Sequence, residues 1–78
     1  MSEKQYRRVP KIPQDFEAAC EWCREATRAI EYWSDQKQVW ILHRSSDEYK
    51  TTLTALKQWK RFKAECETVV KSYQLSLF

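Results

Sequence analysis

Three cysteines and one histidine are the side chains in this sequence with the most distinctive chemistry. Cys20 and Cys23 lie one helical turn apart, and His43 and Cys66 follow at longer spacing. Thiolate sulfur and imidazole nitrogen are common zinc ligands, but one tetrahedral site must gather all four around a single ion. In two antiparallel helices, Cys66 would lie beside the start of the first helix, and His43 on the order of 30 Å away. The spacing therefore predicts buried free thiols and no metal site.

The remaining polar residues offer little for catalysis. The chain has one histidine and no glycine, so it lacks a glycine-rich loop that could hold a phosphate group. Glu21 and Glu25, like Glu65 and Glu67, have the spacing of ordinary carboxylates on a helix surface. We therefore expect no enzymatic activity and no cofactor.

Length and composition predict one small helical domain. The chain has 78 residues and no glycine, and its two prolines are at positions 10 and 13. The tight turns that hairpin strands require are therefore missing. Three cysteines without a secretion signal favour a reducing environment, and we expect a cytoplasmic protein. No apolar run approaches membrane-spanning length, so no membrane partner is expected.

Two stretches of the chain have apolar residues at the three- and four-residue steps of a buried helix face. The first is expected to begin at Gln14 or Asp15, just after a proline. The second is expected to begin at a capping box formed by Ser45 and Glu48. The segment between them, residues 34–45, is interpreted as a short middle helix or as a continuation of the first helix.

The expected fold is all-α, either an antiparallel helical hairpin or a small three-helix bundle, with an extended basic N-terminal arm. Its parts are an arm over residues 1–13, a helical domain over residues 14–73 and a tail over residues 74–78. The apolar band of the second helix is wide enough to need neighbours on two sides. A third helix or a second copy of the chain would supply one, so we expect a homodimer or a larger protein assembly as one arrangement.

Two groups of basic residues could contact the phosphate backbone of DNA or RNA. One group lies in the N-terminal arm, and the other lies along one side of the second helix. The residues are Lys4, Arg7, Arg8 and Lys11 in the arm, and Lys50, Lys57, Lys60 and Arg61 in the helix. For both groups the alternative is a solvated surface, and Val9 and Ile12 of the arm would then pack onto the helices.

Aromatic residues are abundant, with 4 Trp, 4 Tyr and 3 Phe, and some of them are candidates for a protein interface. Trp22 lies toward the edge of the apolar stripe of the first helix, which makes it a candidate contact for a second molecule. Tyr32 and Trp40 are grouped with Trp22 as candidate interface residues. In this interpretation the chain is a structural helical subunit whose aromatic surface packs on another protein.

The last five residues, Gln74-Leu75-Ser76-Leu77-Phe78, place apolar side chains where a helical core has little use for them. At all five positions they resemble the clamp-binding motif of bacterial DNA replication and repair proteins, whose usual form is Gln-Leu-Ser/Asp-Leu-Phe. The resemblance implies that Leu77 and Phe78 fill the deep part of an apolar pocket on the ring-shaped sliding clamp. It also implies that Leu75 lies on a shallower ledge and that Gln74 forms a hydrogen bond at the rim.

This resemblance predicts a small bacterial or phage accessory protein that binds the sliding clamp, either as a recruiter or as an inhibitor. Two alternatives stay open. The helical body and its basic arm could be a nucleic-acid-binding subunit of a larger DNA-processing complex, or the body could be purely structural. In both alternatives, the tail would fold back over the end of the helices.

Overall fold

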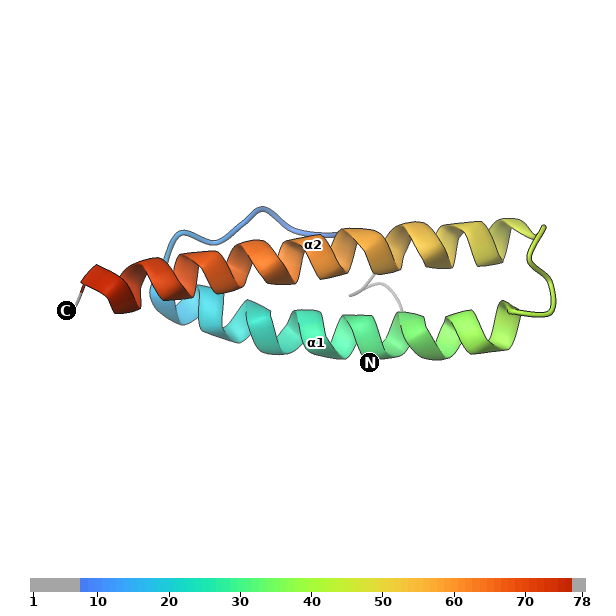
Figure 1. Ribbon diagram of the computed structural model, residues 1–78, viewed down its shortest axis with the longest axis horizontal. Helices are drawn as coiled ribbons and strands as arrows, with labels where there is room; N and C mark the ends of the chain where they lie inside the picture. Colours follow the sequence, from blue (N-terminus) through green and yellow to red (C-terminus); the bar gives the residue numbers. More distant parts are fainter. Residues whose placement is uncertain (1–7, 77–78) are drawn as a thin grey trace.

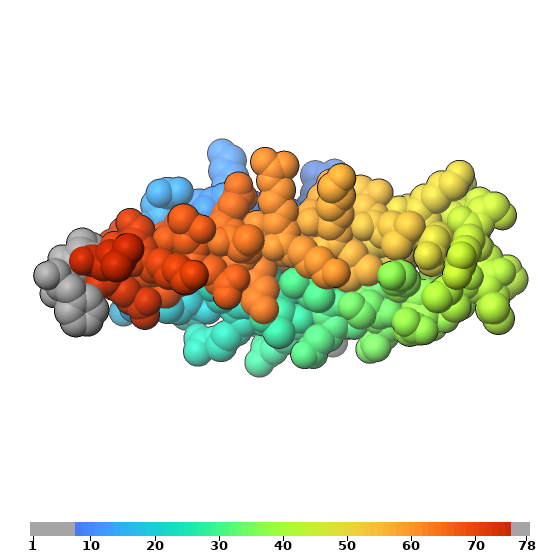
Figure 2. Space-filling model, in the orientation of Figure 1, coloured from blue at the N-terminus to red at the C-terminus, as the bar shows by residue number. Residues whose placement is uncertain are grey.

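Two long antiparallel helices form the body of the protein. The computed structural model describes residues 8–76, with α1 over Phe16–Trp40 and α2 over Asp47–Ser76. A short connection over residues 41–46 joins them (Figure 1), and the result is a rod with extents of 50 × 21 × 17 Å (Figure 2). The all-α prediction and its hairpin form are confirmed.

The three-helix alternative is not supported, because the described part of the chain contains two helices. Residues 34–40 continue α1 without a break, so the prediction of a continued first helix is confirmed and that of a separate middle helix is wrong. The chain turns at residues 41–46, where the His43 amide donates to the Trp40 carbonyl at 2.8 Å and the Ser46 amide donates to the His43 carbonyl at 3.0 Å.

Each helix begins at a side-chain cap. A carboxylate oxygen of Asp15 accepts a hydrogen bond from the Ala18 amide at 3.1 Å, which satisfies one of the free amides of the first turn of α1. At the start of α2, the Ser46 hydroxyl accepts from the Tyr49 amide at 3.2 Å and donates to the His43 carbonyl at 2.6 Å. The cap is therefore Ser46, one residue later than the predicted Ser45, because the turn at His43 sets where α2 can start.

In the middle of the rod, small residues of α1 pack against large residues of α2. Ala26 and Ala29 are fully buried, which lets the helices approach closely, while Trp59, Phe62 and Cys66 fill the space opposite. The rings of Trp59 and Phe62 meet edge to face with centroids 5.5 Å apart. Burying two such rings contributes several kcal/mol, roughly 1.5–3 for each large side chain, and makes this the main source of stability.

Residues 8–15 form a third, non-helical layer beside the two helices. The segment runs back along α2 from the start of α1 (Figure 1), and its Val9 and Ile12 are half-buried against the core. The predicted extended arm is therefore not supported for the described residues 8–13, whereas its alternative, in which Val9 and Ile12 pack onto the helices, is confirmed. This segment covers part of the wide apolar band that we expected a third helix or a partner to cover.

Candidate functional site

The segment that resembles a docking peptide begins where the contact between α1 and α2 ends. The Tyr73 hydroxyl donates a 2.6 Å hydrogen bond to the Gln14 carbonyl, and the Tyr73 ring meets Phe16 edge to face at 5.8 Å. Phe16 is the first residue of α1, so residues after Tyr73 extend beyond the first turn of α1, as the end of α2 does in Figure 1. Tyr73 therefore fixes the base of this segment.

The helix continues into the motif. α2 runs through Ser76, so Gln74, Leu75 and Ser76 have a helical backbone, three residues beyond the predicted end of the second helix. Leu75 is 75% exposed, which shows that it does not fold back over the end of the helices. Gln74 is exposed and lines a groove of about 300 Å³ between the two helices. Leu77 and Phe78, the predicted deep anchors, lie outside the described residues.

A second exposed apolar group lies at the opposite end of the rod. Leu42 in the turn is 90% exposed, and Val39 in the last turn of α1 is 63% exposed. Trp40, one of the three predicted interface aromatics, is half-buried there and meets the His43 ring edge to face at 6.2 Å. The sequence prediction did not single out Val39 or Leu42, although their position in an apolar run before a turn could have indicated exposure.

The other two predicted interface aromatics, Trp22 and Tyr32, are half-buried as well. Trp22 packs within the body, edge to face with Phe62 at 5.8 Å, so at least one side of its ring is used in the fold. Tyr32 meets Trp33 at 5.1 Å, and both residues line an inter-helix groove of about 640 Å³ together with Lys50 and Ala55 of α2. Sequence periodicity did not predict this groove, because residues of both α1 and α2 form it.

The predicted basic residues have mixed placements. Arg8 and Lys11 are exposed beside the packed Val9 and Ile12, whereas Lys4 and Arg7 lie outside the described residues. The four basic residues predicted on the second helix, Lys50, Lys57, Lys60 and Arg61, are all exposed on α2. Arg61 lies 3.9 Å from the Glu65 carboxylate, a distance at the limit of an ion pair.

The three cysteines lie on neighbouring parts of the two helices and are free thiols. Cys66 is fully buried, whereas Cys20 and Cys23 are half-buried, so the predicted burial holds fully only for Cys66. Burial raises the pKa of the Cys66 thiol to about 11. Burial also raises the pKa of the Cys23 thiol, and the Glu67 carboxylate raises it further. These thiols are protonated at neutral pH, which makes them poor nucleophiles.

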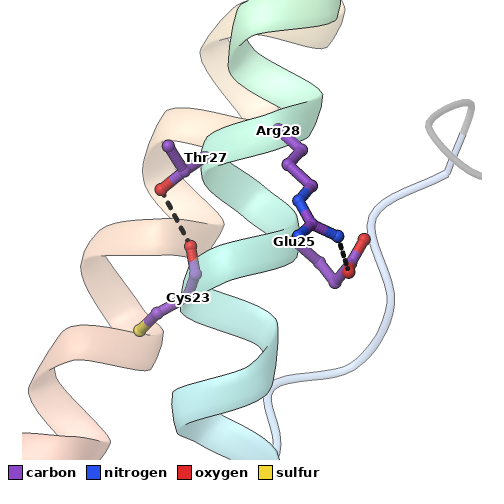
Figure 3. A network of polar contacts seen from close by, with 4 residues as sticks. All are labelled: Cys23, Glu25, Thr27 and Arg28. Atoms are coloured by element: carbon purple, nitrogen blue, oxygen red, sulfur yellow. Dashed lines mark hydrogen bonds and ion pairs between the residues drawn. The ribbon is translucent and has the colours of Figure 1, made fainter.

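The polar contacts around Cys23 are local to α1 (Figure 3). The Thr27 hydroxyl donates to the Cys23 carbonyl at 2.9 Å, and Arg28 pairs with Glu25 at 3.0 Å. Both are contacts between neighbouring turns of one helix and contribute tenths of a kcal/mol, as is usual at a helix surface. Within residues 8–76, no group of three or more potential ligands is arranged to hold a metal ion.

Comparison with protein-family models, with curated proteins and with solved structures gives no match to this chain. Among the described residues, neither helix is both long enough and apolar enough to cross a membrane. The features of the molecule that could bind a partner are the segment after Tyr73, the apolar turn and the charged faces of the helices.

Proposed function

We propose that this protein binds a DNA sliding clamp through residues 74–78 and acts as a bacterial or phage accessory protein of DNA replication or repair. The five-position match of these residues to the clamp-binding motif carries the proposal. The 75% exposure of Leu75 supports it, because a side chain that must enter a partner's pocket cannot be committed to the core.

The contacts of Tyr73 favour this use of the segment. A peptide loses conformational freedom when it binds, at a cost of roughly 1–2 kcal/mol for each backbone residue that becomes ordered. Because Tyr73 is already held by Gln14 and Phe16, the body up to Tyr73 adds nothing to this cost. The docking element is thus short and directly attached to a rigid body.

The apolar anchors set how much affinity their removal should cost. Leu75, Leu77 and Phe78 would each contribute about 1.5–3 kcal/mol on full burial. These gains are opposed by the ordering cost, so they set the loss expected when an anchor is removed and not the absolute affinity. We expect micromolar binding, and a Kd of 1 μM corresponds to about −8 kcal/mol. Micromolar affinity suits either a recruiter, whose body 14–73 holds another partner, or an inhibitor that occupies the pocket.

Calorimetric titration of a purified bacterial sliding clamp tests the proposal. The intact protein should bind, and the Leu77→Ala/Phe78→Ala variant should bind at least ~100-fold more weakly, because two anchors of about 1.5 kcal/mol or more are removed. Val39→Ala/Leu42→Ala is the matched control, since it removes two exposed apolar side chains from the other end of the rod. Failure of the intact protein to bind, or equal losses in both variants, would contradict the proposal.

A further inference from the structure

The two outward faces of the hairpin differ in charge. From Tyr49 to Ala64 the sequence has five basic residues and no acidic residue. Among these five, Lys50, Lys57, Lys60 and Arg61 are exposed. Because Ala55, Trp59 and Phe62 of the same stretch are buried against α1, helical geometry places these cations on the face of α2 that points away from α1. We call these four residues the basic row.

The outer face of α1 has more exposed acidic residues than basic ones. Its exposed charged residues include four carboxylates and two guanidinium groups. The carboxylates belong to Glu17, Glu21, Glu31 and Asp35, and the guanidinium groups belong to Arg24 and Arg28. Arg28 is also paired with Glu25 at 3.0 Å, which reduces its availability to a second anion. A polyanion would therefore be attracted to one side of the rod, the outer side of α2.

The basic row is not neutralised within the described part of the chain. Its one ion pair there joins Arg61 to Glu65 at 3.9 Å, with side chains that are 82% and 48% exposed, respectively. An exposed pair of this kind contributes at most about 1 kcal/mol and exchanges readily for another anion. The row thus holds mobile counterions, and releasing them is the main driving force for binding a phosphate backbone.

The geometry of the row fits an extended anion. With a rise of about 1.5 Å per residue, Lys50 and Arg61 are separated by roughly 16 Å along a straight helix. One DNA strand has a phosphate about every 3.4 Å of helix axis, so this length lies along about five phosphates. Lys71 is exposed further along α2, but it lines a groove with Cys20 and Cys23 of α1 and is not counted in the row.

The aromatic residues decide between duplex and single strand. Proteins that bind single strands stack bases on exposed rings between their cations. Trp59 and Phe62, on the same stretch of α2 as the basic row, are each only 1% exposed. Tyr32 and Trp33, which line a groove together with Lys50, are half-buried. We infer that the outer face of α2 binds the phosphate backbone of duplex nucleic acid, without reading its base sequence, through the basic row.

Fluorescence anisotropy with a labelled duplex of about 20 base pairs, roughly two helical turns, tests this inference in the absence of any clamp. Four phosphate contacts predict that log K falls with log salt with a slope of about −3 to −4. Affinity should therefore fall about 100-fold between roughly 50 and 200 mM salt. Duplexes of different sequence should bind equally.

Matched pairs of substitutions locate the contact. Lys57→Gln/Arg61→Gln removes two positive charges four residues apart on α2, and should reduce the magnitude of the slope by about 2 and the affinity at low salt by about 10-fold or more. Arg24→Gln/Arg28→Gln removes two positive charges at the same spacing on α1 and should change affinity less than about 3-fold. Circular dichroism checks that both variants are folded.

Each other outcome overturns the inference. These are no binding at the lowest salt, a slope near zero, equal losses for the two pairs, and tighter binding to a single strand of the same length than to the duplex. The Leu77→Ala/Phe78→Ala variant should bind duplex as the intact protein does, because neither residue belongs to the basic row. Failure of the duplex contact and failure of the clamp contact are therefore distinguishable.

Discussion

The two ends of the hairpin both expose leucine side chains, but the backbone behind them is held differently. At the turn, Leu42 is 90% exposed, and the backbone around it is already hydrogen-bonded, because the His43 amide donates to the Trp40 carbonyl. At the other end, Leu75 is 75% exposed and follows Tyr73, the last residue with a described contact to the start of α1. Exposure of a leucine is therefore common to both ends, and the contacts that hold the neighbouring backbone distinguish them.

This difference separates a docking peptide from a merely apolar surface. A turn held by its own hydrogen bonds presents a fixed shape, so Leu42 can bind only a partner that matches it. Residues 74–76, which follow Tyr73, form the last turn of α2, and the ends of helices fray most readily. The expected partner contact is thus at the Tyr73 end. Of the four predictions below, one tests the shared core, two test how the ends are held, and one tests the burial of Cys66.

The largest expected effect comes from the core that both ends share. Phe62→Ala should lower the free energy of unfolding by about 3–5 kcal/mol, because the ring contacts Trp22 and Trp59 and leaves a cavity when removed. Urea denaturation monitored by circular dichroism measures it. A loss below about 1 kcal/mol would show that the ends are stabilised independently of the middle.

If Phe62→Ala is too unstable to fold, Phe62→Leu gives a smaller and measurable loss at the same site. The matched control is Val39→Ala, since Val39 is 63% exposed and its removal should cost less than about 0.5 kcal/mol.

At the turn, Ser46→Ala should lower the free energy of unfolding by about 1–2 kcal/mol, because the Ser46 hydroxyl both caps α2 and binds the His43 carbonyl. Ser45→Ala is the control and should cost less than about 0.5 kcal/mol. Thermal or urea unfolding of the two variants side by side decides which serine is the cap. A larger loss for Ser45→Ala would contradict the observed start of α2.

At the Tyr73 end, Tyr73→Phe should cost about 0.5–1.5 kcal/mol, because it removes the hydrogen bond to Gln14 while keeping the ring contact with Phe16. Tyr73→Ala removes both contacts and should cost more. Amide hydrogen exchange near residues 14–16 and 70–76 reports the effect locally. Unchanged exchange in both variants would mean that Tyr73 does not fix the base of the segment.

A further effect, a dependence of stability on pH, appears only above neutrality. The pKa of Cys66 is about 11 in the folded protein against an ordinary value of 9.0, because burial disfavours the thiolate. Its contribution to stability is therefore complete below pH 9 and is lost as the pH rises toward 11. Thermal melts across this range should show a smaller decline for Cys66→Ala than for the intact protein. Parallel declines would contradict the burial of Cys66.

Sequence reasoning could predict the helices, because apolar periodicity and the absence of glycine constrain local structure strongly. It could also predict that the basic row lies on the side of α2 opposite Trp59 and Phe62, since the helical period fixes where each of these residues lies around the helix axis. It misplaced the cap by one residue, because the choice between Ser45 and Ser46 depends on the turn at His43. It left two placements of residues 8–13 open, because the packing of Val9 and Ile12 depends on a surface that exists only after α1 and α2 have met.

The candidate site could be predicted only in part, because some of its features depend on contacts between residues far apart in the sequence. The motif over residues 74–78 is a property of the sequence, and so it could be read directly. The role of Tyr73 at its base could not, because the contact with Gln14 joins residues 59 positions apart in the chain. The exposure of Leu42 likewise depends on where the turn closes.

The most direct test of the central claim is whether the segment alone is sufficient to compete for the clamp. A labelled intact protein bound to a bacterial sliding clamp would be titrated with a peptide of residues 70–78 and with a scrambled peptide of the same composition. The account predicts full displacement by the first peptide, at a Kd within about 10-fold of the intact protein, which corresponds to 1.4 kcal/mol, and none by the second. Intact protein that stays bound at saturating peptide would contradict the claim that residues 74–78 make the contact.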